Sequence, residues 1–139
     1  MKKQIKDICR RYGVGDLYIF GSRVEEVSAL ISGRVDSLRA SPSDVDIGIL
    51  PAERTGWGPR RRVRLTMELE DLLRVDRVDL VLLPEVDAFL ALEIIRGELI
   101  YSDDLDRQAR YELYVLRRAG DLAPFQKERI RAILEEGAR

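Results

Sequence analysis

Three short apolar runs, at 17–20, 45–50 and 77–83, are the feature that most constrains how this chain can fold. Short runs rich in valine, isoleucine and leucine that stop at a glycine or a proline are typical of buried strands. Segments with helical spacing of apolar residues lie between them. The alternation predicts an α/β (α+β) domain, a small mixed β-sheet flanked by helices. Connections this short leave the direction of strand pairing open.

The rest of the chain is predicted to be mainly helical. Four helices are expected beside and between the strands, at 2–12, 24–31, 60–74 and 84–96. Gly13 and Gly15 are expected to end the first of them. A small edge strand is predicted at 99–101. The tail, from 104 to 136, is predicted to be helical and interrupted near Pro124.

Two further expectations concern packing. In the 60–74 helix, apolar residues recur at helical spacing and are expected to share one face: Val63, Met67, Leu69 or Glu70, and Leu73. No repeat or linker divides the chain. We therefore expect residues 1–103 to form the core and residues 104–139 a helical C-terminal extension packed on the same domain.

The composition excludes several classes of function. The chain has no histidine, which rules out a Ser-His-Asp triad and histidine-ligated zinc. Its net charge of -1 predicts no direct nucleic-acid binding. No apolar run is long enough for a membrane helix, and the charged N-terminus does not resemble a secretory signal. The single cysteine, Cys9, is expected to lie in the core and suits a cytoplasmic location.

Two acids interrupt the second apolar run. Asp44 and Asp46 are two residues apart, so on a strand they face the same side. Val45, Ile47 and Ile49 then face the opposite side, which we take to be the core. A carboxylate inside a sheet is costly unless it is paired, protonated or bound to a metal. Asp44 alone has an equally good explanation as the start of the strand.

The third run carries one acid, Asp79. If the two strands lie side by side, Asp44, Asp46 and Asp79 come together. Carboxylates are ligands for hard cations such as Mg²⁺, which can bridge a triphosphate. The third acid is then a candidate base or an additional metal ligand.

A strand-to-helix junction lies ahead of these acids, at Gly21, Ser22 and Arg23. Backbone N–H groups at such a junction can bind an anion, and glycine permits close approach of a phosphate. The Ser22 hydroxyl and the Arg23 guanidinium can add contacts to phosphate oxygens. The simpler alternative is that the serine only caps the helix.

The chain resembles the nucleotidyltransferase superfamily related to DNA polymerase β, and within it the minimal (MNT) nucleotidyltransferases, at FGSR (20–23), SDVDI (43–47) and VDL (78–80). The resemblance covers most of the chain. It implies that Gly21 and Ser22 bind the nucleotide triphosphate, with ATP as substrate. It also implies that Asp44 and Asp46 bind Mg²⁺ and that Asp79 completes the metal site.

The tail carries a narrower resemblance. Its segments at 110–112, 115–117 and 120–125, followed by a basic helix, resemble the C-terminus of MNT antitoxins. The resemblance implies a HEPN-domain toxin as partner, in a homo- or hetero-oligomer of unspecified size. It also implies transfer of AMP from ATP to a tyrosine of that toxin.

The spacing departs from the family pattern, because twenty-one residues separate Ser22 from Asp44, about twice the usual number. A longer loop costs little closure entropy, so the fold is expected to accommodate it. The long spacer nevertheless favours an alternative function, a non-catalytic antitoxin that neutralises the toxin by direct binding.

Two surface features admit two interpretations each. The basic run of Arg60, Arg61, Arg62 and Arg64 is either a solvated helix face or a patch for an acidic partner or phosphates. Trp57 is either a ring that anchors its loop or a platform for a base.

Overall fold

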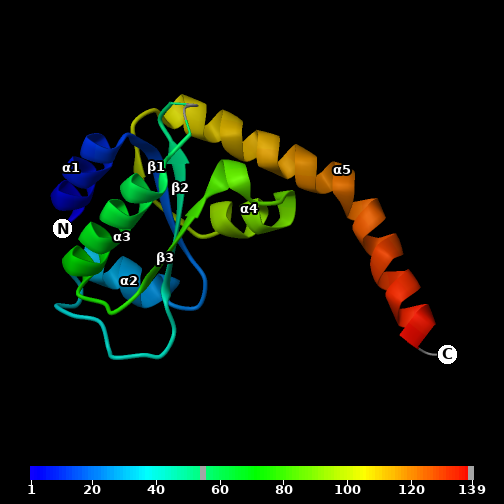
Figure 1. Cartoon of the computed structure of the whole chain (residues 1–139), viewed down its shortest axis with the longest axis horizontal. Coiled ribbons are helices and arrows are strands. Elements are labelled where there is room, and N and C mark those ends of the chain that lie inside the picture. Colours follow the sequence, from blue (N-terminus) through cyan, green and yellow to red (C-terminus); the bar gives the residue numbers. More distant parts are fainter. Residues whose placement is uncertain (54–55, 138–139) are drawn as a thin grey trace.

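The computed structural model describes residues 1–53 and 56–137 as a four-stranded mixed sheet with five α-helices and one short 3₁₀ helix (Figure 1). The elements in chain order are α1 (Lys2–Tyr12), β1 (Val14–Phe20), α2 (Val24–Ile31), β2 (Val45–Pro51), α3 (Pro59–Leu73), β3 (Val78–Leu82), η1 (Leu83–Glu85), α4 (Ala88–Ile95), β4 (Glu98–Ser102) and α5 (Leu105–Gly137). The predicted fold class is confirmed.

The strand order is β3-β2-β1-β4. Strands β2 and β3 are parallel and are joined through α3, whereas β1 runs antiparallel to both β2 and β4. The pairing direction that the sequence left open is therefore mixed. The predicted edge strand is confirmed as β4.

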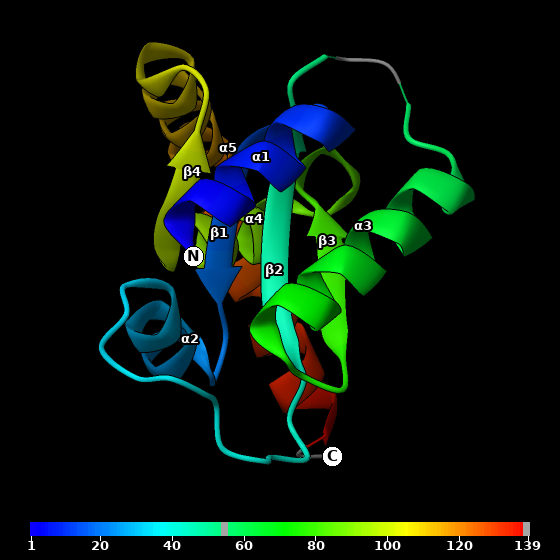
Figure 2. The same cartoon turned by 90° about the vertical axis from the view of Figure 1, so that its left-hand side faces the viewer.

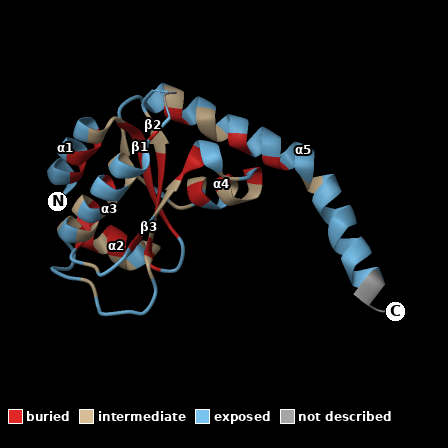
Figure 3. Cartoon of the chain, viewed as in Figure 1, coloured by how far each residue is buried: buried red, intermediate tan, exposed pale blue. Residues whose placement is uncertain are grey.

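The sheet has helices on both faces (Figure 2). Helices α1, α2 and α3 lie on one face, and α4 with the first part of α5 lies on the other. Val45, Ile47 and Ile49 are buried under the first group, as predicted from the alternation in β2. Alternate positions of the sheet face α4, where Tyr18 and Ile94 are buried together. Figure 3 shows buried residues in the sheet and on the helices that flank it. A hydrophobic core thus lies on each face of the sheet.

The N-terminal helix ends at Gly13 alone. Gly13 is the C-cap in a left-handed conformation (φ 73°), which suits glycine. The expectation that Gly15 helps to end the helix is wrong, because β1 already begins at Val14. A Cβ on Gly15 would lie 2.6 Å from an Arg107 guanidinium nitrogen, so its lack of a side chain makes room for that arginine. Cys9 is buried as predicted, and burial raises the pKa of its thiol to about 12.

The buried face of α3 differs in part from the expected one, because Leu69 and Leu73 lie on it but Val63 and Met67 do not. Leu65, Leu69 and Leu73 are buried, at a spacing of four residues. Val63 and Met67 are 56% and 57% exposed. The 60–74 segment has two apolar stripes, and periodicity alone did not show which one meets the sheet.

Helix α5 continues through Pro124, so the predicted interruption is wrong. Proline removes one backbone donor and crowds the carbonyl four residues earlier, which bends a helix without necessarily ending it. The helix changes direction partway along its length (Figure 1). Val115 and Ala119, in its first half, are buried against the core, whereas the described side chains beyond 123 are exposed.

Trp57 anchors its loop. The ring is 6% exposed and belongs to the core, and the Arg61 guanidinium stacks 4.2 Å from its centroid. The structure therefore favours the anchoring interpretation of Trp57 over a base-stacking one. Among the described helices, none is both long and apolar enough to cross a membrane.

Candidate functional site

Asp46 and Asp79 lie directly opposite each other on the adjacent parallel strands β2 and β3. Paired residues of neighbouring strands share a face of the sheet, and neighbouring strands are only about 4.8 Å apart. The sequence predicted that these two acids would come together if the strands paired, and the register brings them together.

The Asp46 carboxyl is in an unfavourable environment for a charge. Its pKa is raised, first by burial and then by the negative charges of Asp79, Asp44 and Glu93. Among residues 1–53 and 56–137, no side chain compensates this cost through a hydrogen bond or an ion pair with Asp46. A bound cation would relieve both the desolvation and the repulsion.

Glu93 is a residue that the sequence analysis missed. It lies exposed on α4, which packs on the same face of the sheet, and its charge acts on Asp46. It is the single charged residue in the helix sequence AFLALEII. An isolated acid in an apolar segment is the same signal that singled out Asp79, so it was available in the sequence.

Asp44 lies just before β2 and is partly exposed. Its Oδ2 is 3.6 Å from Arg77 Nε, a pair that is open to solvent on both sides and therefore weak. Its charge nevertheless acts on Asp46, as expected for residues on the same side of the strand.

The donor set fits Mg²⁺ in chemistry, because it consists of hard carboxylate oxygens and because Mg²⁺ is usually held by one or two carboxylates with water. Asp46 would be the central ligand, with Asp44 beside it at the start of the same strand and Asp79 opposite it on β3. Within residues 1–53 and 56–137, no three His, Cys, Asp or Glu side chains are close enough to hold one ion together. The structure thus pairs two of the three predicted ligands and does not close a three-carboxylate cluster.

The Gly21 turn lies against the acid pair. Gly21 has a φ of 81°, and a Cβ there would lie 2.2 Å from Asp46 Oδ2. The positive φ favours glycine, and the missing side chain leaves room for this carboxylate. The preceding residue, Phe20, is the β1 partner of Asp46. The two halves of the predicted site meet despite the long spacer.

Ser22 is exposed beside this turn and does not cap α2. The N-cap residue is Arg23, and no side chain makes a capping hydrogen bond there. The simple capping alternative for Ser22 is therefore wrong. Ser22 directly follows Gly21, which lies against Asp46. The Ser22 hydroxyl is the group that was predicted to contact a phosphate.

Arg23 has other partners than the predicted phosphate. The side chain is 7% exposed. Its Nε is paired with the Glu26 carboxylate, Nη1 donates to the Ser43 carbonyl oxygen at 3.1 Å, and Nη2 donates to the Arg39 carbonyl oxygen at 2.9 Å. The guanidinium thus connects the turn to the far end of the spacer.

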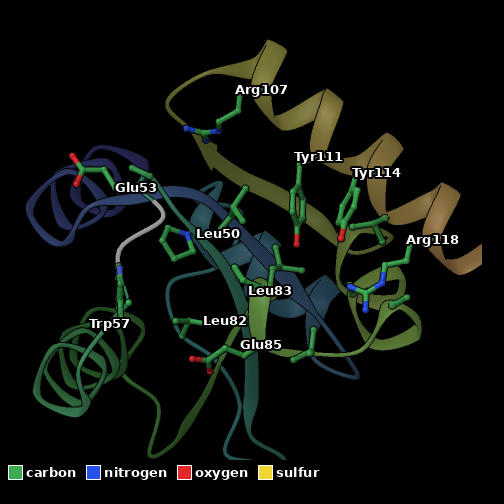
Figure 4. Close-up of a pocket in the computed structure, with 18 residues that line it drawn as sticks. Leu50, Glu53, Trp57, Leu82, Leu83, Glu85, Arg107, Tyr111, Tyr114 and Arg118 are labelled. Atoms are coloured by element: carbon green, nitrogen blue, oxygen red, sulfur yellow. The ribbon is translucent and has the colours of Figure 1, made fainter.

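A cavity of about 520 Å³ lies at the other end of β2 and β3, near Leu50 and Leu82. Tyr111 and Tyr114 point into it from α5 (Figure 4). The described residues that line it do not include the acids of the site, which lie near the first residues of both strands. The acid pair and the Gly21 turn therefore form an open site on the sheet face, separate from this cavity.

Comparison with known proteins agrees with this geometry. Residues 3–106 match the sequence family described as Polymerase beta, Nucleotidyltransferase. No curated protein sequence matches the chain. A mutant of the toxin–antitoxin MntA–HpeT superposes with a TM-score of 0.66 at 21% identity, over 100% of this chain and 99% of that one.

Two further solved structures have the same fold. A toxin–antitoxin with AMP-PNP gives a TM-score of 0.62 at 22% identity, over 99% of this chain and 98% of the other. A tri-AMPylated HEPN toxin in complex with MNT antitoxin, from Shewanella oneidensis, gives 0.62 at 22% identity, over 99% and 96%. Similarity at this level of identity establishes a shared fold.

The mixed sheet, the acid pair and the glycine turn against it define a nucleotidyltransferase-like fold. The family match covers most of the chain. The chain belongs to the polymerase β nucleotidyltransferase family.

Proposed function

We propose that this protein is a Mg²⁺-dependent nucleotidyltransferase that transfers AMP from ATP to a tyrosine hydroxyl of a cognate HEPN toxin, and so acts as an antitoxin. The observation that carries the proposal is the contact of the Gly21 turn with Asp46, which itself faces Asp79 across β2 and β3. A phosphate-binding turn and a cation site must adjoin for a metal-bound triphosphate to occupy both.

Each residue of the site has its own role in the proposed reaction. The backbone at Gly21 and the Ser22 hydroxyl hold the triphosphate. Asp46 and Asp44 carry the negative charge that binds Mg²⁺, which supplies positive charge against the triphosphate. Asp79, exposed on the edge strand β3, accepts the proton of the incoming hydroxyl.

The reaction is an in-line displacement. The tyrosine oxygen forms a bond to the α-phosphorus, and the bond from that phosphorus to the bridging oxygen of pyrophosphate breaks. The tyrosine proton passes to the carboxylate and pyrophosphate leaves. Positioning and preorganised charge supply most of the rate enhancement in such a displacement.

Two findings support the proposed partner, a HEPN toxin, and the proposed acceptor, a tyrosine of that toxin. The similar structures are described as toxin–antitoxin complexes, one with AMP-PNP and one with a tri-AMPylated HEPN toxin. The similarity spans nearly the whole of this chain, including α5. AMP transfer to a HEPN toxin is therefore the activity that we test first.

The test uses ATP labelled at the α-phosphate, Mg²⁺ and, as the candidate toxin, the protein product of the gene adjacent to the one that encodes this chain. The wild type is expected to label a tyrosine of the toxin and to abolish its toxic activity. Asp46→Asn is expected to reduce labelling by at least about 100-fold, in the range of losses for a group that positions transition-state charge. Asp7→Asn, an exposed acid on α1, is the control and should retain full labelling.

A second candidate is an antitoxin that acts by binding alone. The absence of a closed three-carboxylate cluster among the described residues favours it. If the wild type transfers no label and the Asp44→Asn/Asp46→Asn double variant neutralises the toxin fully, binding is the function and the transferase proposal is wrong.

A further inference from the structure

The spacer between the two halves of the site ends at a buried arginine contact. Arg23 follows the Gly21–Ser22 turn directly, and Ser43, whose carbonyl it binds, directly precedes Asp44. A single side chain therefore joins positions twenty residues apart in sequence. The contact lies where the Gly21–Ser22 turn meets the beginning of β2, the strand that carries Asp46.

The contact is of a kind that only arginine makes. Three nitrogens of one planar group bind a carboxylate and two backbone carbonyls in different directions. A lysine ammonium is a point charge on a flexible stem and cannot reproduce this geometry. Hydrogen bonds from a charged group are about twice as strong as neutral ones, so the contact is a firm one for a loop.

The spacer has few other attachments that would fix its end. Its backbone hydrogen bonds from Arg34 and Val35 to the Ala29 carbonyl lie at its beginning, beside α2. Leu38 packs against the core in its middle. From 39 onward, the hydrogen bonds that connect it to the turn are those of Arg23 with the Arg39 and Ser43 carbonyls.

The Gly21–Ser22 turn also lies close to strand β2. A Cβ on Gly21 would lie 2.2 Å from Asp46 Oδ2, so the turn places its backbone close to this carboxylate. Movement away from it would separate the phosphate position from the acids. The Arg23 contact opposes that separation.

We propose that Arg23 is a positioning residue: its guanidinium holds the Ser43 end of the spacer against the Gly21–Ser22 turn and thereby fixes the distance between the phosphate-binding turn and the Mg²⁺-binding acids. This inference rests on the proposed function for its kinetic consequence. It assigns the long spacer a defined end, so that its length does not loosen the site.

The test compares Arg23→Gln and Arg23→Lys with Arg39→Ala. Arg39 takes part through its carbonyl oxygen, so its side chain can be removed without breaking the contact. This control also removes one positive charge near the site. Cooperative thermal melting first establishes that each variant is folded.

Both Arg23 variants are expected to lower kcat by about 10- to 100-fold, the cost of a displacement of about 1 Å at a reacting centre. The Mg²⁺ concentration for half-maximal rate should rise, and KM for ATP should change less than kcat. Arg39→Ala should match the wild type. A rise confined to KM for ATP would identify Arg23 as a phosphate ligand and overturn the proposal.

Hydrogen–deuterium exchange provides a readout that does not need activity. In Arg23→Gln, amide exchange should accelerate in residues 36–46 and stay unchanged in α1 and α3. Exchange equal to that of the wild type in this segment would overturn the proposal. If the wild type transfers no AMP, the proposed function is wrong, and the exchange result still decides the role of Arg23.

Glu26→Gln gives a second route if both Arg23 variants fail to fold. It keeps the arginine and removes the charge that orients Nε. It should accelerate exchange in the same segment by a smaller factor. No change there would contradict the proposal.

Discussion

Asp46 and Asp79 are register partners in the parallel pair β2 and β3, and a Cβ on Gly21 would collide with the same Asp46 carboxylate. Two like charges thus lie side by side beneath a turn whose positive φ favours glycine. This arrangement costs stability when the carboxyls are ionised and no cation is present.

Asp46→Asn is expected to stabilise the metal-free protein at neutral pH. The pKa of Asp46 is raised in the folded state, so this group contributes less stability as pH rises through that pKa. Asparagine removes the ionised form and should raise Tm at pH about 7.5 by up to about 2 °C, because Asp46 is partly exposed and solvent screening limits the gain to roughly 0.5 kcal/mol or less. Near pH about 4 the two proteins should differ little.

The same variant tests metal binding. Millimolar Mg²⁺ should raise the Tm of the wild type, because a ligand of the folded state stabilises it by mass action. Asp46→Asn should lose this increase. Thermal melting with and without Mg²⁺ measures both effects, and an equal Mg²⁺ effect in the two proteins would contradict the assignment of Asp46 as a ligand.

Glu93→Gln is expected to weaken Mg²⁺ binding without abolishing it. Glu93 is exposed and acts on Asp46 through its charge, so its removal takes away a screened attraction. Such an interaction is worth roughly 1 kcal/mol or less, or up to about a fivefold change in affinity. Calorimetric titration with Mg²⁺ measures it. Asp121→Asn, an exposed acid on α5 that does not act on Asp46, should leave the affinity unchanged.

Gly97→Ala is expected to destabilise the domain. A Cβ at this position would lie 2.2 Å from the Ile19 carbonyl oxygen, and backbone cannot yield as a flexible side chain does. We expect the free energy of unfolding to fall by about 1–3 kcal/mol or more, as for other overpacking substitutions.

Gly120→Ala is the matched opposite case. Gly120 lies within α5, and nothing lies within 4 Å of an added Cβ. Alanine should stabilise the helix by about 0.5–1 kcal/mol. Urea denaturation of both variants should give changes of opposite sign; a loss for Gly120→Ala would mean that its helix is held in a strained form.

Much of the fold could be predicted from local pattern. The alternation in β2 placed Val45, Ile47 and Ile49 in the core, and the helical spacing at 24–31 located α2. These succeed because burial on one face imposes a period on the sequence. Where two apolar stripes compete, as on α3, the choice depends on which neighbour the helix meets, and Val63 was misplaced for that reason.

The candidate site shows the same limit. Asp46 and Asp79 could be paired from sequence because each interrupts an apolar run. The partners of Arg23 could not, because a contact across twenty residues of irregular chain leaves no period to read. The continuation of α5 through Pro124 could not be predicted either. A proline indicates that a helix is disturbed, but not whether the helix bends or ends there.

Arg107→Met is expected to be among the most destabilising single changes. The Asp16 side chain is only 1% exposed, and its Oδ1 accepts from Arg107 Nη2 at 3.0 Å and from Ser102 Oγ at 2.6 Å. Removing the arginine leaves a buried carboxylate without its counter-charge. A broken buried pair typically costs about 3–5 kcal/mol. The contact joins β1 to α5, so the first turns of α5 should loosen as well.

The loss should depend on pH. Burial raises the pKa of Asp16, while Ser102 and Arg107 lower it, so removing Arg107 raises that pKa further. A raised pKa in the folded state means that stability is lost as pH rises through it. Urea denaturation should therefore show a larger loss at pH about 7.5 than at pH about 5. Asp103→Asn removes the other, more exposed partner of Arg107 and should cost about 1 kcal/mol or less. An equal loss at both pH values in Arg107→Met would mean that lost packing, and not the uncompensated Asp16 charge, causes the destabilisation.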